Sequence, residues 1–364
     1  MISLQEVEKR YASAPAPAVS GLTLDVAEGD TVALVGPSGC GKTTTVKMIN
    51  RLIEPTGGRI LLAGANVLER DPVELRRGIG YVIQQTGLLP HRTVRDNIVT
   101  VPRLLGWERD RTDARVEEMV EIFDLAPDLL ARYPAELSGG QRQRVGVARA
   151  LAADPPVMLM DEPFAAVDPI VRGRLQDQFL DIQRRLRKTI VLVTHDVDEA
   201  IKLADRVAVL NVGGVLEQYA PPEEILRAPA SAFVEEFVGA DRGLKRLGLI
   251  PVGTIETEPG PTVSSSSDAS EALAVIAAGN LGWANVVDEG MLRGWVDEAS
   301  LTDRRRVADA TIRPLSSTVA ADDSLRQALN AIVTSETGVA VVVRSDGSYI
   351  GILTLERLSR ELAA

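Results

Sequence analysis

Long apolar runs without polar alternation mark the core of the first two thirds of the chain. They cover Thr31–Val35, Val157–Met160 and Thr189–Thr194, and a further run, Ile79–Gln85, ends in two amides. A strand that is covered on both faces has this profile, whereas a strand with one solvated face alternates apolar and polar positions. The runs therefore predict a buried parallel β-sheet and an α/β fold.

Other segments of this part predict a β-rich and a helical subdomain. Residues 1–30 alternate apolar and polar positions and end in a turn. From about residue 86 to 156 the pattern becomes helical, and Val145–Pro155 is an amphipathic helix that the proline ends. Ser138 is a good N-cap for this helix. Together these segments indicate a first domain over residues 1–240.

The remaining residues, 241–364, have a different pattern of apolar and polar positions and contain an internal repeat. The first unit covers about residues 250–303 and the second about 311–362. Each runs through a strand, an acidic cap, an amphipathic helix, an apolar strand, a turn with glycine, another strand and a short helix. The run Ser264–Ser267 lies at the start of the first unit, so we expect a strand edge there rather than a flexible linker. The second domain is therefore predicted to be an α+β repeat.

Composition and charge narrow the function classes. The chain has 364 residues, 45% hydrophobic and 25% charged, as in ordinary globular proteins of two or three domains. Its net charge of −11 argues against a nucleic-acid partner, because duplex binding normally shows a basic surface. No signal-peptide core is evident and no apolar run approaches the roughly 20 residues that span a bilayer, so we expect a cytosolic protein. Cys40 is the single cysteine, which excludes an intramolecular disulfide.

The segment Gly36–Thr43, which follows the first apolar run, carries the clearest chemical signal. It reads GPSGCGKT and fits the phosphate-loop pattern G-x-x-x-x-G-K-[ST] at every defined position. Glycines let backbone N–H groups point at phosphate oxygens, and the next helix presents its positive N-terminal end to the same charge. Lys42 is expected to reach the β- and γ-phosphates and to act in catalysis, and the Thr43 hydroxyl to ligate Mg²⁺. The nucleotide-binding residues expected here are Gly36, Pro37, Ser38, Gly39, Cys40, Gly41, Lys42, Thr43 and Thr44.

Three polar side chains follow the other buried runs. Asp161 and Glu162 come directly after one run, and His195 directly after another. Ligands of open α/β sheets bind at the carboxyl ends of the strands. We therefore expect Asp161 to hold Mg²⁺ through its water shell and Glu162 to polarise the attacking water. Alone, His195 would be interpreted as a structural residue, but its position at the same sheet edge favours a catalytic role.

With four further motifs, these residues resemble the ATPases of ABC transporters over about residues 1–240. The further motifs are Tyr11, Gln84, the signature LSGGQ at residues 137–141 and the loop AAVD at residues 165–168. The signature, continued by RQR, is highly specific. The loop departs mildly from the usual SALD and keeps Asp168. The resemblance implies a phosphate-loop NTPase fold with a β-rich and a helical subdomain, and ATP and Mg²⁺ as cofactors.

The resemblance also implies roles for these residues and a site shared between subunits. Tyr11 would stack on adenine; the alternative is that it packs on its own sheet. Gln84 would bind the metal and couple the site to a partner, and Gln85 beside it is an alternative. Asp168 and the signature residues would contact the nucleotide. The signature residues, which would clamp ATP bound to a second subunit, are Ser138, Gly139, Gly140 and Gln141. A chain with one set of motifs is thus expected to form a head-to-tail homodimer.

The internal repeat resembles a tandem CBS pair, a module that often binds adenine nucleotides. An ABC ATPase with this tail resembles the ATP-binding subunits of importers for glycine betaine, carnitine, choline or related quaternary amines. The resemblance implies an ATPase at the cytoplasmic face of the cell membrane, with integral membrane permease subunits and, through them, a substrate-binding protein. The insert Thr86–Arg132, with its apolar loop Leu88–His91, is expected to contact the permease. The tail is expected to regulate transport, with an adenine nucleotide or cyclic dinucleotide as candidate ligand.

Three alternatives stay open on the sequence. The importer could serve another small solute, such as an amino acid or a polyamine. The chain could be a soluble ABC ATPase of DNA repair or translation, although such proteins usually carry two ATPase sets or a long coiled-coil insert. The tail could be a dimerisation module without a ligand.

Overall fold

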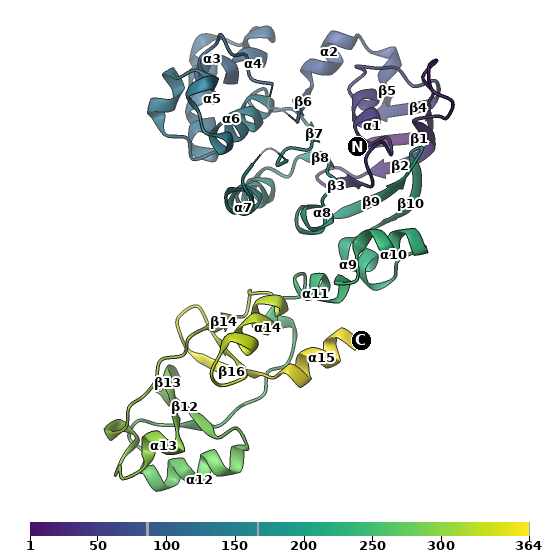
Figure 1. Cartoon of the computed structure of the whole chain (residues 1–364). Coiled ribbons are helices and arrows are strands. Elements are labelled where there is room, and N and C mark those ends of the chain that lie inside the picture. Colours follow the sequence, from purple (N-terminus) through teal and green to yellow (C-terminus); the bar gives the residue numbers. More distant parts are fainter. Residues whose placement is uncertain (85–86, 166, 364) are drawn as a thin grey trace. The chain divides into compact units, whose positions relative to one another are not determined.

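The chain folds into two compact units, Met1–Gly239 and Ala240–Ala364 (Figure 1). The computed structural model describes residues 1–84, 87–165 and 167–363. Each unit has its own hydrophobic cores. None of the described helices combines the length and the apolar composition that crossing a membrane requires.

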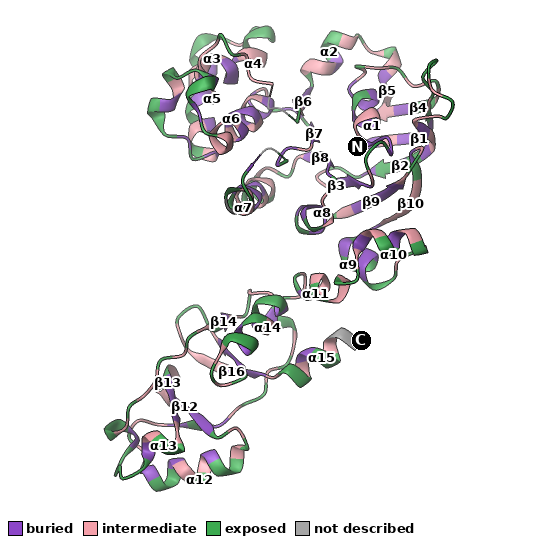
Figure 2. Cartoon of the chain, in the orientation of Figure 1, coloured by how far each residue is buried: buried purple, intermediate pink, exposed green. Residues whose placement is uncertain are grey.

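A six-stranded sheet in the order β10-β9-β3-β8-β7-β6 forms the centre of the first unit. Its strands are β3 (Thr31–Val35), β6 (Ile79–Val82), β7 (Val157–Asp161), β8 (Thr189–Val193), β9 (Arg206–Asn211) and β10 (Val215–Ala220). Neighbouring strands from β9 to β6 run parallel, and β10 adds an antiparallel edge. Every residue of β3, β7 and β8 is buried (Figure 2). The parallel sheet predicted from the apolar runs is confirmed.

The two faces of this sheet pack into different cores. In β7, Val157 and Leu159 belong to one cluster, which includes helix α1 (Lys42–Ile49) and a second sheet. Met158 and Met160 belong to the other cluster, which includes helices α6 (Gly139–Leu151) and α7 (Pro169–Leu186). The second sheet is antiparallel and consists of β1 (Ile2–Lys9), β2 (Val19–Val26), β4 (Gly57–Leu62) and β5 (Ala65–Asn66). Because successive side chains of a strand point to opposite faces, a strand covered on both sides buries all of them. The polar residues of these strands lie at their ends: Thr31 in β3, Asp161 in β7 and Thr189 in β8.

Helices α3, α4, α5 and α6 form a group of their own in Figure 1. The bounds are Val94–Ile98 for α3, Thr100–Leu104 for α4 and Arg109–Ile122 for α5, with short 3₁₀ turns at Pro127–Ala131 and Pro134–Glu136. Ser138 caps α6 as predicted, since its side chain accepts a hydrogen bond from the Gln141 backbone N–H, 3.2 Å. The other helices of the unit are α2 (Pro72–Arg77), α8 (Val197–Leu203), α9 (Pro222–Arg227) and α10 (Ala232–Val238), with a 3₁₀ turn at Val67–Glu69.

Strand β6 is shorter than the sequence suggested. It ends at Val82, whereas the apolar run predicted a strand up to Gln85, a residue outside the described range. Gln84 is exposed in a turn, and its side-chain amide donates to the Glu162 carboxylate. The chain therefore leaves the sheet two residues before Gln84, and this turn allows the Gln84 side chain to reach Glu162 at the carboxyl ends of the strands.

The second unit contains two three-stranded sheets of the same topology. The first, β11-β12-β13, and the second, β14-β15-β16, each have one parallel and one antiparallel pairing. The strands are β11 (Thr262–Val263), β12 (Trp283–Asp288), β13 (Met291–Asp297), β14 (Thr318–Ala320), β15 (Ala340–Val343) and β16 (Tyr349–Leu353). The helices are α11 (Arg242–Leu247), α12 (Ala269–Gly279), α13 (Glu298–Leu301), α14 (Leu325–Thr334) and α15 (Leu355–Ala363), with 3₁₀ turns at Val252–Thr254 and Val307–Asp309. The internal repeat predicted from the sequence is thus present in the fold.

The cores of the two repeats exchange segments. Val252, which precedes the first repeat's strands, packs in the core of the second repeat, and its N–H donates to the Asp323 carbonyl, 2.7 Å. Val307, which precedes the second repeat's strands, packs in the core of the first repeat, and its N–H donates to the Ser267 carbonyl, 3.0 Å. The repeats are therefore interlocked, whereas the sequence pattern places Val252 in the first unit, about residues 250–303, and leaves Val307 between the two units.

The run Ser264–Ser267 forms a turn, and the strand edge predicted for it is wrong. β11 ends at Val263, before the serines. The Asp288 carboxylate accepts hydrogen bonds from the Ser264 hydroxyl and the Ser265 N–H, both 2.9 Å. Serine readily forms such side-chain contacts in turns, where they replace the hydrogen bonds of a strand.

Candidate functional site

The phosphate loop connects β3 to α1 and has a backbone that requires glycine at two positions. Gly36 has φ 150°, and a Cβ atom there would lie 2.1 Å from the Leu210 carbonyl oxygen. Gly41 has φ 99°, and a Cβ atom there would lie 2.5 Å from the Ala18 carbonyl oxygen. Both conformations lie in the region that side chains disfavour. The loop can therefore wrap closely against β9 and the segment before β2, as a phosphate cradle needs.

Lys42 lies at the start of α1 with its side chain directed over the loop. The residue is 7% exposed, and its Nζ donates to the carbonyl oxygens of Gly36, 2.6 Å, and Pro37, 3.0 Å. The thiol of Cys40 lies 3.6 Å from the same nitrogen. An ammonium held above a glycine loop is placed to interact with the phosphates that such a loop binds.

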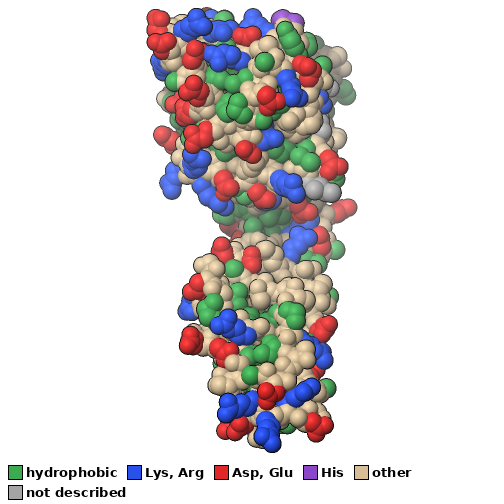
Figure 3. Space-filling view, turned by 90° about the vertical axis from the view of Figure 1, so that its left-hand side faces the viewer, with side chains coloured by type: hydrophobic (Ala, Val, Ile, Leu, Met, Phe, Trp, Pro, Cys, Tyr) green, Lys and Arg blue, Asp and Glu red, His purple; other side chains and the backbone are tan. Residues whose placement is uncertain are grey.

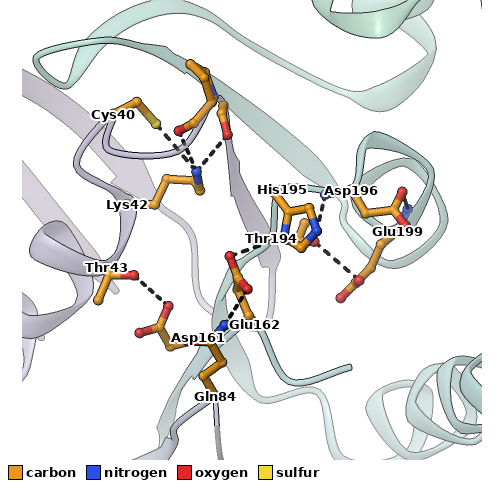
Figure 4. A network of polar contacts seen from close by, with 12 residues as sticks. Cys40, Lys42, Thr43, Gln84, Asp161, Glu162, Thr194, His195, Asp196 and Glu199 are labelled. Atoms are coloured by element: carbon orange, nitrogen blue, oxygen red, sulfur yellow. Dashed lines mark hydrogen bonds and ion pairs between the residues drawn. The ribbon is translucent and has the colours of Figure 1, made fainter. Parts of the chain in front are cut away.

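Thr43 and Asp161 bring two oxygens together beside the loop. The Thr43 hydroxyl donates to Asp161 Oδ1, 2.9 Å, across the gap between α1 and the end of β7 (Figure 4). Asp161 is 7% exposed, and burial raises the pKa of its carboxyl, as does the Glu162 carboxylate, while the Thr43 hydrogen bond lowers it. Mg²⁺ prefers oxygen ligands and usually shares them with substrate phosphates. These two residues therefore fit a Mg²⁺ bound together with a nucleotide.

Glu162 is the meeting point of three elements. Gln84 Nε2, from the turn after β6, lies 2.8 Å from Glu162 Oε2, and His195 Nδ1, from the end of β8, lies 3.2 Å from Oε1 (Figure 4). The Glu162 backbone is left-handed, with φ 47°, and its N–H donates to the Val193 carbonyl, 2.9 Å. A residue other than glycine is rarely held in this conformation, and such strain concentrates at functional sites. The sheet edge thus fixes a carboxylate between an amide and an imidazole.

The structure does not bring every residue named from the sequence to this cluster. Tyr11 follows β1, is 39% exposed, and has the Lys9 ammonium 5.2 Å from its ring centroid. Asp168 is exposed, and its carbonyl accepts the Arg172 N–H at the start of α7, 2.8 Å. The loop AAVD is described apart from Ala166, and Gln85, the alternative to Gln84, also lies outside the described residues.

The signature segment is located in the helical group rather than at the phosphate loop. Besides the Ser138 cap, Gln141 Oε1 accepts the Ser138 N–H, 2.8 Å, so the two residues form a reciprocal capping box at the start of α6. Figure 1 shows α6 with α3–α5, apart from α1. The N-terminus of α6 is a positive helix end that carries two glycines and can face an anion on another molecule.

Comparison with known proteins places this arrangement in a family. The ABC transporter model matches residues 19–165, and the CBS domain model matches residues 307–364. An osmoprotectant import ATP-binding protein of Salmonella typhimurium is 46% identical over 371 residues, which cover 100% of this chain and 97% of that protein. The chain belongs to the ATP-binding subunits of ABC-type osmoprotectant importers. Its ATPase unit is accordingly followed by a CBS domain.

Other matches support the same family. A glycine betaine/carnitine/choline transport ATP-binding protein of Bacillus subtilis is 50% identical, and the alignment covers 85% of this chain and 81% of that protein. Among solved structures, a dimeric ATP-binding cassette in a post-hydrolysis state bound to ADP and Pi superposes with a TM-score of 0.55 at 32% identity. It covers 61% of this chain and 99% of that chain. As an ABC ATPase, this subunit uses ATP with Mg²⁺, which agrees with the oxygens of Thr43 and Asp161 described above.

Two residues beside the ATPase site were not expected from the sequence. Arg149 of α6 donates from Nη1 to the Gly87 carbonyl, 2.6 Å, and so joins the signature helix to the segment after Gln84. Glu199 is 5% exposed in the first turn of α8, four residues after His195. The sequence alone does not indicate a special role for either residue. An arginine inside an amphipathic helix and an acid in a first helical turn usually face solvent.

Proposed function

We propose that the chain is the ATP-hydrolysing subunit of an importer for glycine betaine or another quaternary amine, working through separate membrane permease subunits at the cytoplasmic face of the cell membrane. The observation that carries this proposal is the 46% identity to an osmoprotectant import protein along the whole chain, tail included. A choline transport ATP-binding protein of Bacillus subtilis is likewise 45% identical over 97% of this chain. The solute itself would be selected by the permease and a substrate-binding protein.

We propose the following residue roles, which the geometry supports. Glu162 would orient the attacking water, and His195 would contact the γ-phosphate region beside it, 3.2 Å from Glu162. Lys42 would bind the β- and γ-phosphates, and Thr43, Gln84 and Asp161 would hold Mg²⁺ directly or through water. The further nucleotide contacts would come from Tyr11, Gly36, Pro37, Ser38, Gly39, Cys40, Gly41, Thr44, Asp168, Ser138, Gly139, Gly140 and Gln141.

A head-to-tail homodimer would complete the site. Within one subunit, the signature residues 138–141 lie at the start of α6, which belongs to the helical group. The phosphate loop lies elsewhere, before α1. A second copy could direct its α6 N-terminus at the γ-phosphate, where the positive helix end is favourable. This arrangement supports two composite sites for each dimer.

The helical group, with the loop 88–91, would contact the permease. The Leu89 N–H donates to Asn97 Oδ1, 2.7 Å, and Asn97 Nδ2 donates back to the Leu89 carbonyl, 3.2 Å. Arg149 holds Gly87 on the other side. Leu89 is thus fastened to α3, and Gly87 to α6. A change at Gln84 could therefore move the helical group, which is the physical link that coupling requires.

We further propose that residues 241–364 are a tandem CBS module, with repeats at about 250–303 and 311–362, that regulates transport. A cleft of about 540 Å³ lies between segments of both repeats. Its wall includes Gly260, Val275, Leu281 and Ile352, and the Thr354 hydroxyl donates to Glu258 Oε1 at its edge, 3.2 Å. This size is typical of small-molecule sites, and an adenine nucleotide or cyclic dinucleotide is the candidate class.

Solute uptake by proteoliposomes tests the transport proposal. The full-length chain, assembled with its permease subunits and binding protein, is expected to drive ATP-dependent uptake of glycine betaine, choline or carnitine. Amino acids, polyamines and glycerol phosphate form the control panel. Uptake of a control solute with none of a quaternary amine would overturn the proposed substrate class, and ATPase activity that no permease stimulates would overturn the transport role.

Removing the tail after Gly239 tests its regulatory role. The first unit is compact and has its own cores, so the truncated chain is expected to keep ATPase activity and most uptake. The response of uptake to salt and to added adenine nucleotides should flatten, with typical couplings of about 1 to 3 kcal/mol, or roughly 5- to 150-fold in affinity. Full-length and truncated transporters are compared at matched protein density in the same vesicles. Superimposable response curves would leave the tail as a dimerisation module.

A further inference from the structure

Glu199 is a buried acid whose environment differs from that of Asp198, the other acid in the first turn of α8. The residue is 5% exposed, whereas its neighbour Asp198 is exposed. Asp196 already caps the helix, because its side chain accepts hydrogen bonds from the backbone N–H groups of Asp198 and Glu199. Burying a carboxylate is costly unless it is paired and fully hydrogen-bonded. Helix capping therefore does not account for Glu199.

The contacts of Glu199 lead directly to the residues on either side of His195. The Thr194 hydroxyl donates to Glu199 Oε2, 3.2 Å, and accepts the Asp196 N–H, 3.0 Å (Figure 4). Among the described residues, none forms a hydrogen bond with Glu199 Oε1, although this atom is buried. A neutral carboxyl group tolerates one unpartnered oxygen far better than a carboxylate does. Its geometry thus favours a protonated Glu199.

The charges that face Glu199 favour the same form. They are the carboxylates of Asp196 and Glu162 and the guanidinium of Arg172, which reaches from α7 to within 3.7 Å of Asp196 Oδ2. Burial and the Asp196 carboxylate raise the pKa of Glu199 to about 7, with a smaller contribution from Glu162, while Thr194 and Arg172 oppose the rise. Because the pKa is raised, the neutral acid predominates below about pH 7 and the carboxylate above it.

We propose that Glu199 in its neutral form is a positioning residue for His195: by holding the Thr194 hydroxyl, it fixes the backbone on both sides of His195 and keeps the imidazole against Glu162. Ionisation would place a third negative charge beside Asp196 and Glu162. The carboxylate would be repelled by Asp196 and Glu162 and attracted to Arg172. Because the Thr194 hydroxyl donates to this group and binds the ionised form more strongly, Thr194 would move with it and displace the backbone beside His195. This inference rests on the proposed role of His195 in ATP hydrolysis.

The pH dependence of ATP hydrolysis by the full-length chain tests the proposal. Between about pH 6 and 9 the wild-type kcat is expected to fall at least about threefold as Glu199 ionises. Glu199→Gln, a neutral isostere, should keep its low-pH kcat through this range. Glu199→Ala should lower kcat about tenfold at every pH, with KM for ATP within about twofold, because it loses positioning but not nucleotide binding. Asp198→Asn, on the same turn but exposed, serves as the matched control and should follow the wild type.

Infrared difference spectra and the variant His195→Ala distinguish a wrong role for Glu199 from a wrong role for His195. The wild-type spectrum should lose a protonated-carboxyl band as the pH rises through about 7, and Glu199→Gln should lack that change. A Glu199→Gln profile that still falls like the wild type, or an unaltered Glu199→Ala, would overturn the positioning role. Wild-type activity in His195→Ala would instead overturn the proposed role of His195.

Discussion

Glu162→Gln is expected to keep ATP affinity within a few-fold of the wild type while lowering steady-state hydrolysis roughly 100- to 10,000-fold, the range for loss of a positioned general base. The phosphate cradle and Lys42 are untouched by the change. The glutamine oxygen can still accept from Gln84 Nε2, so the geometry around position 162 should survive. What is lost is the charge that orients and polarises water. The measurement is ATP binding by titration together with phosphate release at saturating ATP.

The same variant should accumulate as an ATP-bound dimer, which light scattering would detect. The reason is that the variant binds ATP but does not hydrolyse it, and hydrolysis is the step that allows the subunits to separate. Glu69→Gln makes the same chemical change at an exposed position in the β-rich part of the first unit and should behave like the wild type. Hydrolysis by Glu162→Gln within a few-fold of the wild-type rate would show that another group orients the water.

Heterodimers of Lys42→Ala and Ser138→Arg subunits are expected to hydrolyse ATP at up to about half the wild-type rate, because one of two composite sites is intact. Each homodimer should be inactive. Lys42→Ala removes the ammonium above the loop, and Ser138→Arg removes the cap of α6 and adds bulk at the signature. In the mixed dimer both defects fall in one composite site, and the other site combines an intact phosphate loop with an intact signature. Differently tagged subunits allow the heterodimer to be isolated before its ATPase rate is measured.

A matched control distinguishes complementation from residual activity. Heterodimers of Lys42→Ala with the double variant Lys42→Ala/Ser138→Arg contain no intact phosphate loop and should stay inactive. Isolated heterodimers of the two single variants that recover no activity would count against the head-to-tail arrangement. Recovery in the control would show that Lys42 is dispensable.

The centre of the first unit was predictable because its signals are local and strong. The runs at β3, β7 and β8 are apolar apart from one terminal residue, and their length and composition are typical of strands buried on both faces. The glycine pattern of the phosphate loop requires a backbone that the structure shows at Gly36 and Gly41. Ser138 precedes an amphipathic helix and caps it. At these places local preference and tertiary packing agree.

Prediction failed where a distant partner determines the local structure. Ser264–Ser267 turns because Asp288, in another strand, supplies the hydrogen bonds. Glu199 is buried and accepts a hydrogen bond from Thr194, at the end of strand β8, although its position in the sequence is typical of a solvated first turn. One sequence contains no record of such pairings, so periodicity alone cannot place them.

In the second unit, the core of each repeat is completed by a 3₁₀ turn from outside that repeat: Val252 lies with Leu325 in one core, and Val307 with Ala272 in the other. Contacts between residues so far apart in sequence must form before either half retains its shape, which slows folding and makes unfolding a single cooperative event. If the chain were divided between the repeats, each repeat would lose the segment that completes its hydrophobic core. Recombination can therefore transplant this module between proteins only as a whole.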